Sequence, residues 1–102
     1  MNIPDDLKPG IEKKIQAFNA ERHSKYHARY RGKFLYLDRD DGSQRLSPIC
    51  RLTFTGEMQA WEFAIYKYST QSYDPEEWFF PGEQHVDGTL EGAMMAGLEA
   101  YA

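Results

Sequence analysis

The residues best suited to chemistry gather in the stretch 22–33, which is rich in lysine and arginine, carries two histidines and two tyrosines, and has no acid. Arginines beside exposed aromatic rings neutralise phosphates and stack on bases, which is how single strands are held without a deep pocket. The stretch therefore suggests contact with nucleic acid. The same charges also suit the negative C-terminal end of a helix. The candidate interaction surface adds basic and aromatic residues from later in the chain: Arg22, Lys25, Arg29, Arg31, Lys33, Arg51, Tyr66 and Tyr68.

A metal site is the second chemistry that the residue types allow. His23 and His27 stand four apart and would share one face of a helix, where His85 with Asp87 or Glu83 could complete a shell. However, the glutamate of an HExxH motif is missing, and the neighbouring lysines and arginines oppose a bound cation. We therefore assign no metal ligand and no cofactor.

Acid-base catalysis is the third chemistry. A histidine and four acids lie close enough in sequence to surround a small pocket near Trp78, as hydrolases require. The chain has no glycine-rich phosphate loop, nucleophile elbow or cysteine protease signature. Helix caps and turns explain the acids more simply, so a hydrolase-like enzyme around His85 is an alternative interpretation. The residues in question are Asp74, Glu76, Glu77, His85 and Asp87.

The strands that must position these residues are indicated by alternation. Over residues 59–68, Trp61, Phe63 and Ile65 fall on one side, and polar or smaller residues fall on the other, which is typical of a half-buried strand. Two earlier strands, 34–37 and 45–55, are joined by an Asp-Gly turn. In the strand 45–55 we expect Cys50, Leu52 and Phe54 to point inward and Ile49, Arg51, Thr53 and Thr55 to point outward.

Two helices complete the expected elements. Ile11, Ile15 and Phe18 recur at helical spacing and predict a helix from Pro9 to Ala28, with Gly32 as its stop. A final helix is capped by Asp87 or Thr89. Its apolar face comprises Leu90, Ala93, Met94, Gly97, Leu98 and Tyr101, and its glycines suggest close packing. Between the sheet and this helix, we expect residues 78–80 to form a short fourth strand or a loop that covers the sheet edge.

The predicted fold is a single α+β domain over residues 1–102. Three strands with tight connections form an antiparallel meander, with a fourth short strand as an option, and both helices cover one face. This order resembles that of the double-stranded RNA-binding domain over residues 9–102. That family places a lysine-rich cluster at the start of its second helix, where this chain has Asp87-Gly88-Thr89-Leu90-Glu91. The chain is therefore not assigned to the family.

The charge of the chain divides sharply after Arg51. Residues 1–51 hold 11 lysines and arginines against 7 acids, giving +4, whereas residues 52–102 hold one lysine against 9 acids, giving −8. Such a split suggests an interaction surface at the basic end, and it equally fits two halves that face and neutralise each other. The leading interpretation is a non-catalytic module that binds another protein or itself. Nucleic-acid binding by the basic helix end and the aromatic sheet face is the main alternative.

The cellular location is predicted from what the chain lacks. Cys50 is its single cysteine and cannot form an internal disulfide, which fits a reducing compartment. Residues 1–6 have neither the basic start nor the apolar run of a signal peptide, and the apolar run 93–98 is too short to span a bilayer. We therefore expect a cytoplasmic protein that makes no membrane contact.

Overall fold

One antiparallel sheet and two helices make up the protein, which was examined as a computed structural model that describes residues 1–40, 42–43 and 45–101. The predicted turn at Asp41-Gly42 lies partly outside the described residues. Short 3-10 turns at Asp5–Leu7 and Glu83–His85 precede the two helices. The helices are α1 (Lys8–Arg22) and α2 (Leu90–Ala100), and the strands are β1 (Tyr26–Arg31), β2 (Phe34–Asp40), β3 (Leu46–Thr53), β4 (Glu62–Lys67) and β5 (Ser72–Asp74).

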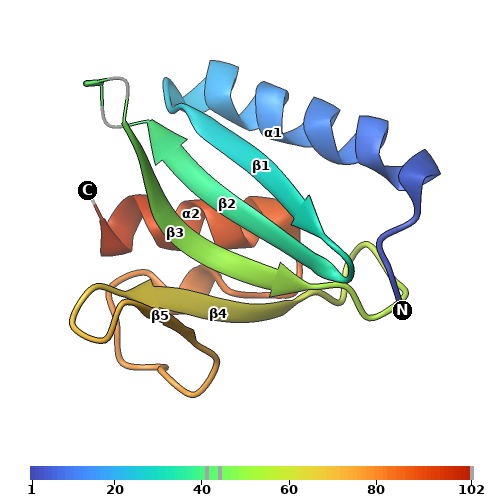
Figure 1. Ribbon diagram of the computed structural model, residues 1–102. Coiled ribbons are helices and arrows are strands. Elements are labelled where there is room, and N and C mark those ends of the chain that lie inside the picture. Colours follow the sequence, from blue (N-terminus) through green and yellow to red (C-terminus); the bar gives the residue numbers. More distant parts are fainter. Residues whose placement is uncertain (41, 44, 102) are drawn as a thin grey trace.

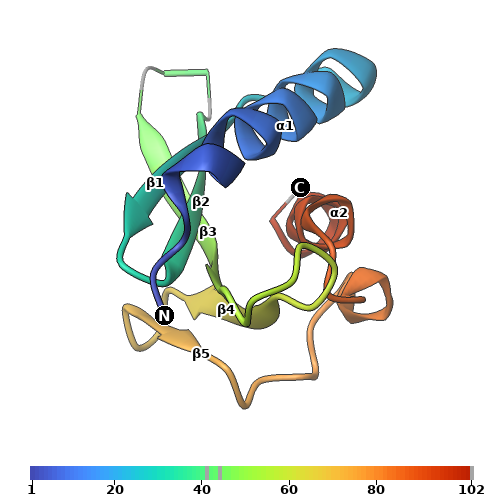
Figure 2. The same cartoon turned by 90° about the vertical axis from the view of Figure 1, so that its right-hand side faces the viewer.

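The α+β class is confirmed, but the three-strand meander is not. Five strands lie in the order β1-β2-β3-β4-β5, each antiparallel to the next, and both helices cover the same face (Figures 1 and 2). The element order thus has two more strands than the expected one. The additional strands are β1, which was predicted as helix, and β5, which lies just before the segment 78–80 where a fourth strand was an option. Among the described residues, no helix is long and apolar enough to span a membrane.

The prediction of a helix from Pro9 to Ala28 is wrong at its C-terminal end. Helix α1 stops at Arg22, and His23 follows in the left-handed conformation with a φ of 55°. The side chain of Asn19 then pairs with the backbone of Tyr26, accepting from its N–H at 2.9 Å and donating to its carbonyl oxygen at 3.0 Å. This pairing imitates a strand neighbour and starts β1 directly after the helix. From Tyr26 onward, burial alternates along the strand.

Gly32 is a hairpin residue and not the stop of a helix. It has a φ of 60° and lies in the two-residue connection between β1 and β2. Tight hairpins need a positive φ in this connection, and glycine adopts it without strain. The hairpin places β1 at the edge of the sheet, and the alternation along β1 directs residues 27, 29 and 31 to the face opposite the helices.

In β3, the observed burial agrees with the predicted alternation of inward and outward residues except at Ile49. Cys50, Leu52 and Phe54 are buried as predicted. Ile49 was expected to point outward and is instead 1% exposed. The reason is a register shift between Leu37 and Asp38, which leaves Ile49 as the extra residue of a bulge.

Helix α2 packs closely on the sheet, as its small residues suggest. Thr89 caps it, accepting from the N–H of Gly92 at 3.0 Å. Gly97 lies against Tyr26 of β1 and Ile49 of β3, so closely that a Cβ atom there would overlap both side chains. The Tyr26 hydroxyl donates to the carbonyl oxygen of Met94 at 2.7 Å. The core between helices and sheet is thereby fixed at one end, where α1, β1 and α2 meet.

Candidate functional site

The structure divides the predicted interaction surface between two places. Tyr66 and the basic residues of β1 and β3 lie on the sheet face that the helices leave uncovered, with Lys33 in the adjoining hairpin, whereas Arg22 and Lys25 line a pocket at one end of the molecule. Tyr68 belongs to both, because its ring packs on Tyr66 and also lines the pocket. The prediction that the basic stretch forms one helix end is therefore wrong, since the chain turns into β1 within it.

The uncovered sheet face carries a layer of its own side chains, here called the arginine-tyrosine face. Its rings contact one another across the strands, with centroid distances of 5.3 Å between Tyr36 and Tyr73 and 5.0 Å between Tyr66 and Tyr73. Ala64 of β4 is buried on this side, at 3% exposure, although its side chain faces away from the helices. The sheet is therefore packed on both faces. The face comprises Arg29, Phe34, Tyr36, Asp38, Arg51, Tyr66 and Tyr73.

Arg29 is held in this face by a fork of two hydrogen bonds. Its Nε donates to Asp38 Oδ2 at 2.5 Å and its Nη2 donates to Oδ1 at 3.2 Å. The hydrogen bond to Asp38 raises the pKa of the arginine, and the carboxylate itself is almost fully buried. The guanidinium also lies 4.8 Å from the ring centroid of Tyr36. Arg29 is thus neutralised within the protein and brings little free charge to a partner.

Among the described residues, Arg51 is the cation of this face that has no carboxylate partner. Its guanidinium lies 4.7 Å from the centroid of Phe34 and 5.7 Å from that of Tyr73. Within the described chain its buried Nε has no hydrogen-bond partner. Because Arg51 and Arg29 both lie over rings, part of the aromatic surface that would stack on bases is already covered. Burial is the main cause of the raised pKa of Tyr73.

The segment 78–80 does not cover the sheet edge with all three aromatic residues. Phe80 alone behaves as predicted, stacking on Phe63 with ring centroids 5.8 Å apart. Trp78 is 44% exposed and Phe79 is 96% exposed. The turn is fixed instead by polar contacts, because Lys67 pairs with Glu77 at 3.1 Å and Glu77 accepts from the N–H of Phe79 at 2.9 Å. These contacts hold Phe79 out in water, where it lines a hollow together with Ile65 of β4 and Tyr101.

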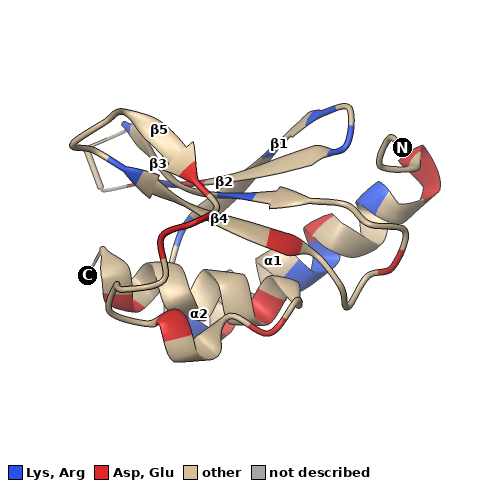
Figure 3. Ribbon diagram, turned by 90° about the horizontal axis from the view of Figure 1, so that it is seen from below, with Lys and Arg blue, Asp and Glu red and all other residues tan. Residues whose placement is uncertain are grey.

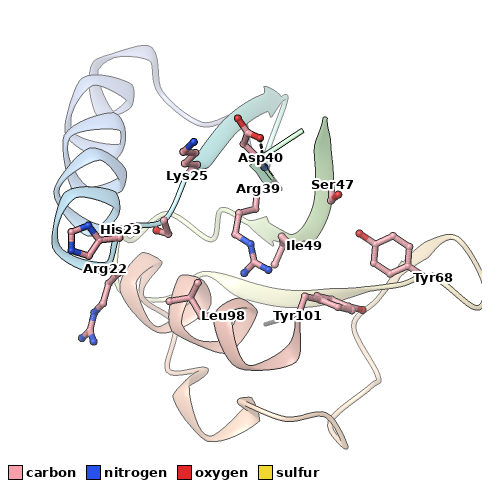
Figure 4. Close-up of a pocket in the computed structure, with 12 residues that line it drawn as sticks. Arg22, His23, Lys25, Arg39, Asp40, Ser47, Ile49, Tyr68, Leu98 and Tyr101 are labelled. Atoms are coloured by element: carbon pink, nitrogen blue, oxygen red, sulfur yellow. Dashed lines mark hydrogen bonds between the residues drawn. The ribbon is translucent and has the colours of Figure 1, made fainter. Parts of the chain in front are cut away.

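A pocket of about 680 Å³ opens between the ends of both helices and the adjacent strand ends, and we call it the end pocket. In Figure 4 Arg39 lies between Lys25 and the two tyrosines. Arg39 is anchored, since its Nη1 donates to the carbonyl oxygen of Gly97 at 3.2 Å. The side chains that line the pocket include Arg22, His23, Lys25, Arg39, Asp40, Ser47, Ile49, Tyr68, Leu98 and Tyr101.

The proposed acid-base group is distributed over separate interactions. Asp74 and Glu77 both pair with Lys67, at 3.7 and 3.1 Å. Asp87 accepts from the hydroxyl of Thr89 beside the α2 cap, which lowers the pKa of Asp87. His85 contacts Glu99 of α2 at 2.9 Å and lines neither the end pocket nor the hollow beside Phe79. Caps and ion pairs thus account for these residues, and Glu76 donates only its N–H, to Asp74.

The two histidines expected on one helical face do not share one. His23 is the residue that ends α1, and His27 lies on β1. Within the described part of the chain, no group of three or more potential ligands from histidine, cysteine, aspartate and glutamate is placed to hold a metal ion.

The charge division of the sequence persists in the fold. Figure 3 shows basic residues along the β1-β2 hairpin and acidic residues in the segment between β5 and α2. Among the ion pairs of the described residues, the one between Lys14 and Glu91, at 3.5 Å, joins the two halves. Within the described part of the chain, this is the one ion pair through which the halves neutralise each other directly.

Comparison of the chain with protein families, with curated proteins and with solved structures found no match in any of the three. The site therefore rests on geometry alone. Sequence reasoning missed Arg39, Tyr73 and Tyr101 as members of the two surfaces. Alternation along β2 places Arg39 on the same side as Leu35 and Leu37 and was a usable signal, whereas the positions of Tyr73 and Tyr101 follow from how distant segments meet.

Proposed function

We propose that this protein is a non-catalytic interaction module that binds another protein, or a second copy of itself, through the arginine-tyrosine face and the aromatic loop at its β5 edge. Phe79 carries the proposal. A phenylalanine side chain gains about 1.5–3 kcal/mol when it is fully buried, and here it is 96% exposed while hydrogen bonds hold its loop in place. A partner that covers Phe79 and Trp78 would recover this free energy.

The residue types of the arginine-tyrosine face support the same proposal. Tyrosine, tryptophan and arginine are the residues that most often dominate binding energy at protein interfaces. The arginine-tyrosine face presents these residues in fixed positions, because the arginines are packed against the rings and Arg29 is bonded to Asp38. Fixed side chains lose little conformational entropy when a partner binds.

The free charges suggest an acidic partner surface. Arg31, Lys33 and Arg51 have no carboxylate within ion-pair distance among the described residues. Complementary acids on a partner would steer the approach and fix the orientation of binding. The acidic half of a second copy would also satisfy this requirement.

The test compares Phe79→Ser with Leu46→Ser, a control that removes an exposed apolar residue at the start of β3. Self-association predicts that the wild type and Leu46→Ser form dimers or larger species in size-exclusion chromatography with light scattering, and that Phe79→Ser is monomeric. Association that weakens at high salt would support the electrostatic contribution.

If the wild type is a monomer, quantitative affinity capture tests for a different partner. The proposal expects a protein that the wild type and Leu46→Ser retain and that Phe79→Ser and Arg51→Ala lose. A monomer at both salt concentrations, together with capture that does not depend on Phe79 or Arg51, would refute the proposal.

Single-stranded nucleic acid is the second candidate, favoured by Arg31, Lys33 and Arg51, which have no carboxylate partner among the described residues, and by the rings of Phe34 and Tyr73 that Lys33 and Arg51 contact. Fluorescence anisotropy of labelled oligonucleotides at two salt concentrations tests it, and binding should weaken steeply with salt. The matched variant is Arg31→Glu with Lys33→Glu, because replacing Arg29 would leave the Asp38 carboxylate buried without its partner. Absence of binding at tens of micromolar protein would refute this candidate.

A further inference from the structure

We infer that the end pocket is a binding site for a small organic phosphate with a flat ring, of the size of a nucleoside monophosphate. This inference does not rest on the proposed protein interface, because Phe79 and the arginines of the arginine-tyrosine face do not line the pocket, although Tyr68 and Tyr101 also border the hollow beside Phe79. It rests on the volume of the pocket, on the charges of its lining residues and on the contacts that each cation already makes within the protein.

The volume and lining suit a small ligand. At about 680 Å³ the pocket falls within the range typical of small-molecule sites, which are apolar with a few placed polar groups. Ile49 and Leu98 supply apolar surface, and Ser24 and Ser47 add hydroxyl groups. The pocket can therefore hold a ligand that has both a polar and an apolar part.

The charge in the pocket favours an anion. Three cationic residues, Arg22, Lys25 and Arg39, line the pocket, and Asp40 is the single acid among its described lining residues. The carboxylate of Asp40 already accepts from the N–H of Gly42 at 2.8 Å. A phosphate dianion would offset the excess positive charge, and its oxygens suit the donors of arginine and lysine.

The three cations of the pocket differ in the contacts that they make within the protein. Arg39 donates to the helix carbonyl of Gly97 and lies over the Tyr26 ring at 5.8 Å, so it is held in position. Arg22 contacts only the ring of Phe18, at 5.9 Å, and neither it nor Lys25 has a carboxylate partner in the described chain.

The far side of the pocket suits a flat ring. Tyr68 and Tyr101 meet edge to face, with centroids 5.3 Å apart, and both line the pocket on the side opposite Lys25 (Figure 4). The Tyr101 hydroxyl donates to the carbonyl oxygen of Tyr66, and that of Tyr68 donates to Pro48 at 3.0 Å. Both rings are thus fixed, and a planar base could pack on them while its phosphate reaches the cations.

The test titrates the protein with adenosine monophosphate, adenosine and inorganic phosphate, following amide shifts in two-dimensional NMR spectra. We expect saturable binding of adenosine monophosphate, with the amides of Ser24, Lys25, Ser47 and Leu98 shifting. Adenosine and inorganic phosphate should each bind at least about tenfold more weakly, because each lacks one half of the contacts. A guanosine or cytidine monophosphate that binds more tightly would leave the ligand class unchanged.

The matched variants separate the pocket from general charge. Arg22→Ala with Lys25→Ala should weaken binding about tenfold or more, whereas Lys13→Ala with Lys14→Ala removes the same charge from exposed sites outside the pocket and should have no effect. All four residues are exposed, so both variants should fold. Equal binding of adenosine monophosphate and inorganic phosphate, equal loss in both variants, or no saturable binding of any mononucleotide at millimolar concentration would overturn the inference.

Discussion

Gly97 is the position at which the packing of the whole fold can be tested by one methyl group. In an exposed helix, alanine is about 0.5–1 kcal/mol more favourable than glycine. At Gly97 the added Cβ would overlap the Tyr26 hydroxyl and the Cγ2 of Ile49. Overpacking of this kind costs about 1–3 kcal/mol, and displacement of the hydroxyl from the Met94 carbonyl costs about 1–3 kcal/mol more. We expect Gly97→Ala to lower the free energy of unfolding by about 2–4 kcal/mol.

Urea unfolding followed by circular dichroism measures this loss. With a denaturant slope of about 1–2 kcal/mol per molar for a small domain, the midpoint should fall by about 1–4 M. The control is Gly10→Ala in α1, where a Cβ has no atom within 4 Å beyond its neighbours, so that the same substitution should be neutral or raise stability. In a Tyr26→Phe background the cost of Gly97→Ala should shrink. A Gly97→Ala protein as stable as the wild type would refute the packing of α2 on β1 and β3.

Two further predictions test the uncovered face and the core. Arg29→Met should destabilise the protein by more than Asp38→Asn, which should cost about 1–3 kcal/mol, because removing the arginine leaves a buried carboxylate uncompensated. Urea unfolding of both variants measures the order, and the reverse order would contradict the buried pair. Burial raises the pKa of the Cys50 thiol, so little thiolate is present at pH 8, and a disulfide reagent should label Cys50 only after denaturant is added. Rapid labelling of the folded protein would contradict the position of Cys50 in the core.

Sequence patterns predicted the parts of the fold in which one face is apolar and the other is not. Trp61, Phe63 and Ile65 are buried as their alternation indicates, and Gly97 makes the close approach that glycines in α2 suggested. Such patterns are reliable because a slip of one residue would expose the large side chains. They fail at Ile49, where a bulge changes the alternation within a strand.

The basic stretch was misassigned for a different reason. Tyr26, Ala28 and Tyr30 do face the helices, but tyrosine and alanine give a weak apolar signal, and the charged residues between them suit the surface of a helix equally well. Asn19 decides that the stretch is not helical, because its side chain pairs with the backbone of Tyr26 and stops the helix. A single asparagine inside a helical pattern does not reveal that contact in advance. The sequence does not reveal the end pocket in advance either, since its residues come from segments as distant as 22–25 and 98–101.

Tyr68 determines how the two surfaces must be separated experimentally. Its ring packs on Tyr66 of the arginine-tyrosine face at 4.9 Å and on Tyr101 of the end pocket at 5.3 Å. A substitution at Tyr68 would therefore disturb both surfaces, and a loss of either kind of binding would not locate the site. Phe79 and Lys25 are better positions, because Phe79 does not line the end pocket and Lys25 does not line the hollow beside Phe79, although Tyr68 and Tyr101 border both. Variants at these two positions distinguish a protein-binding edge from a ligand-binding pocket.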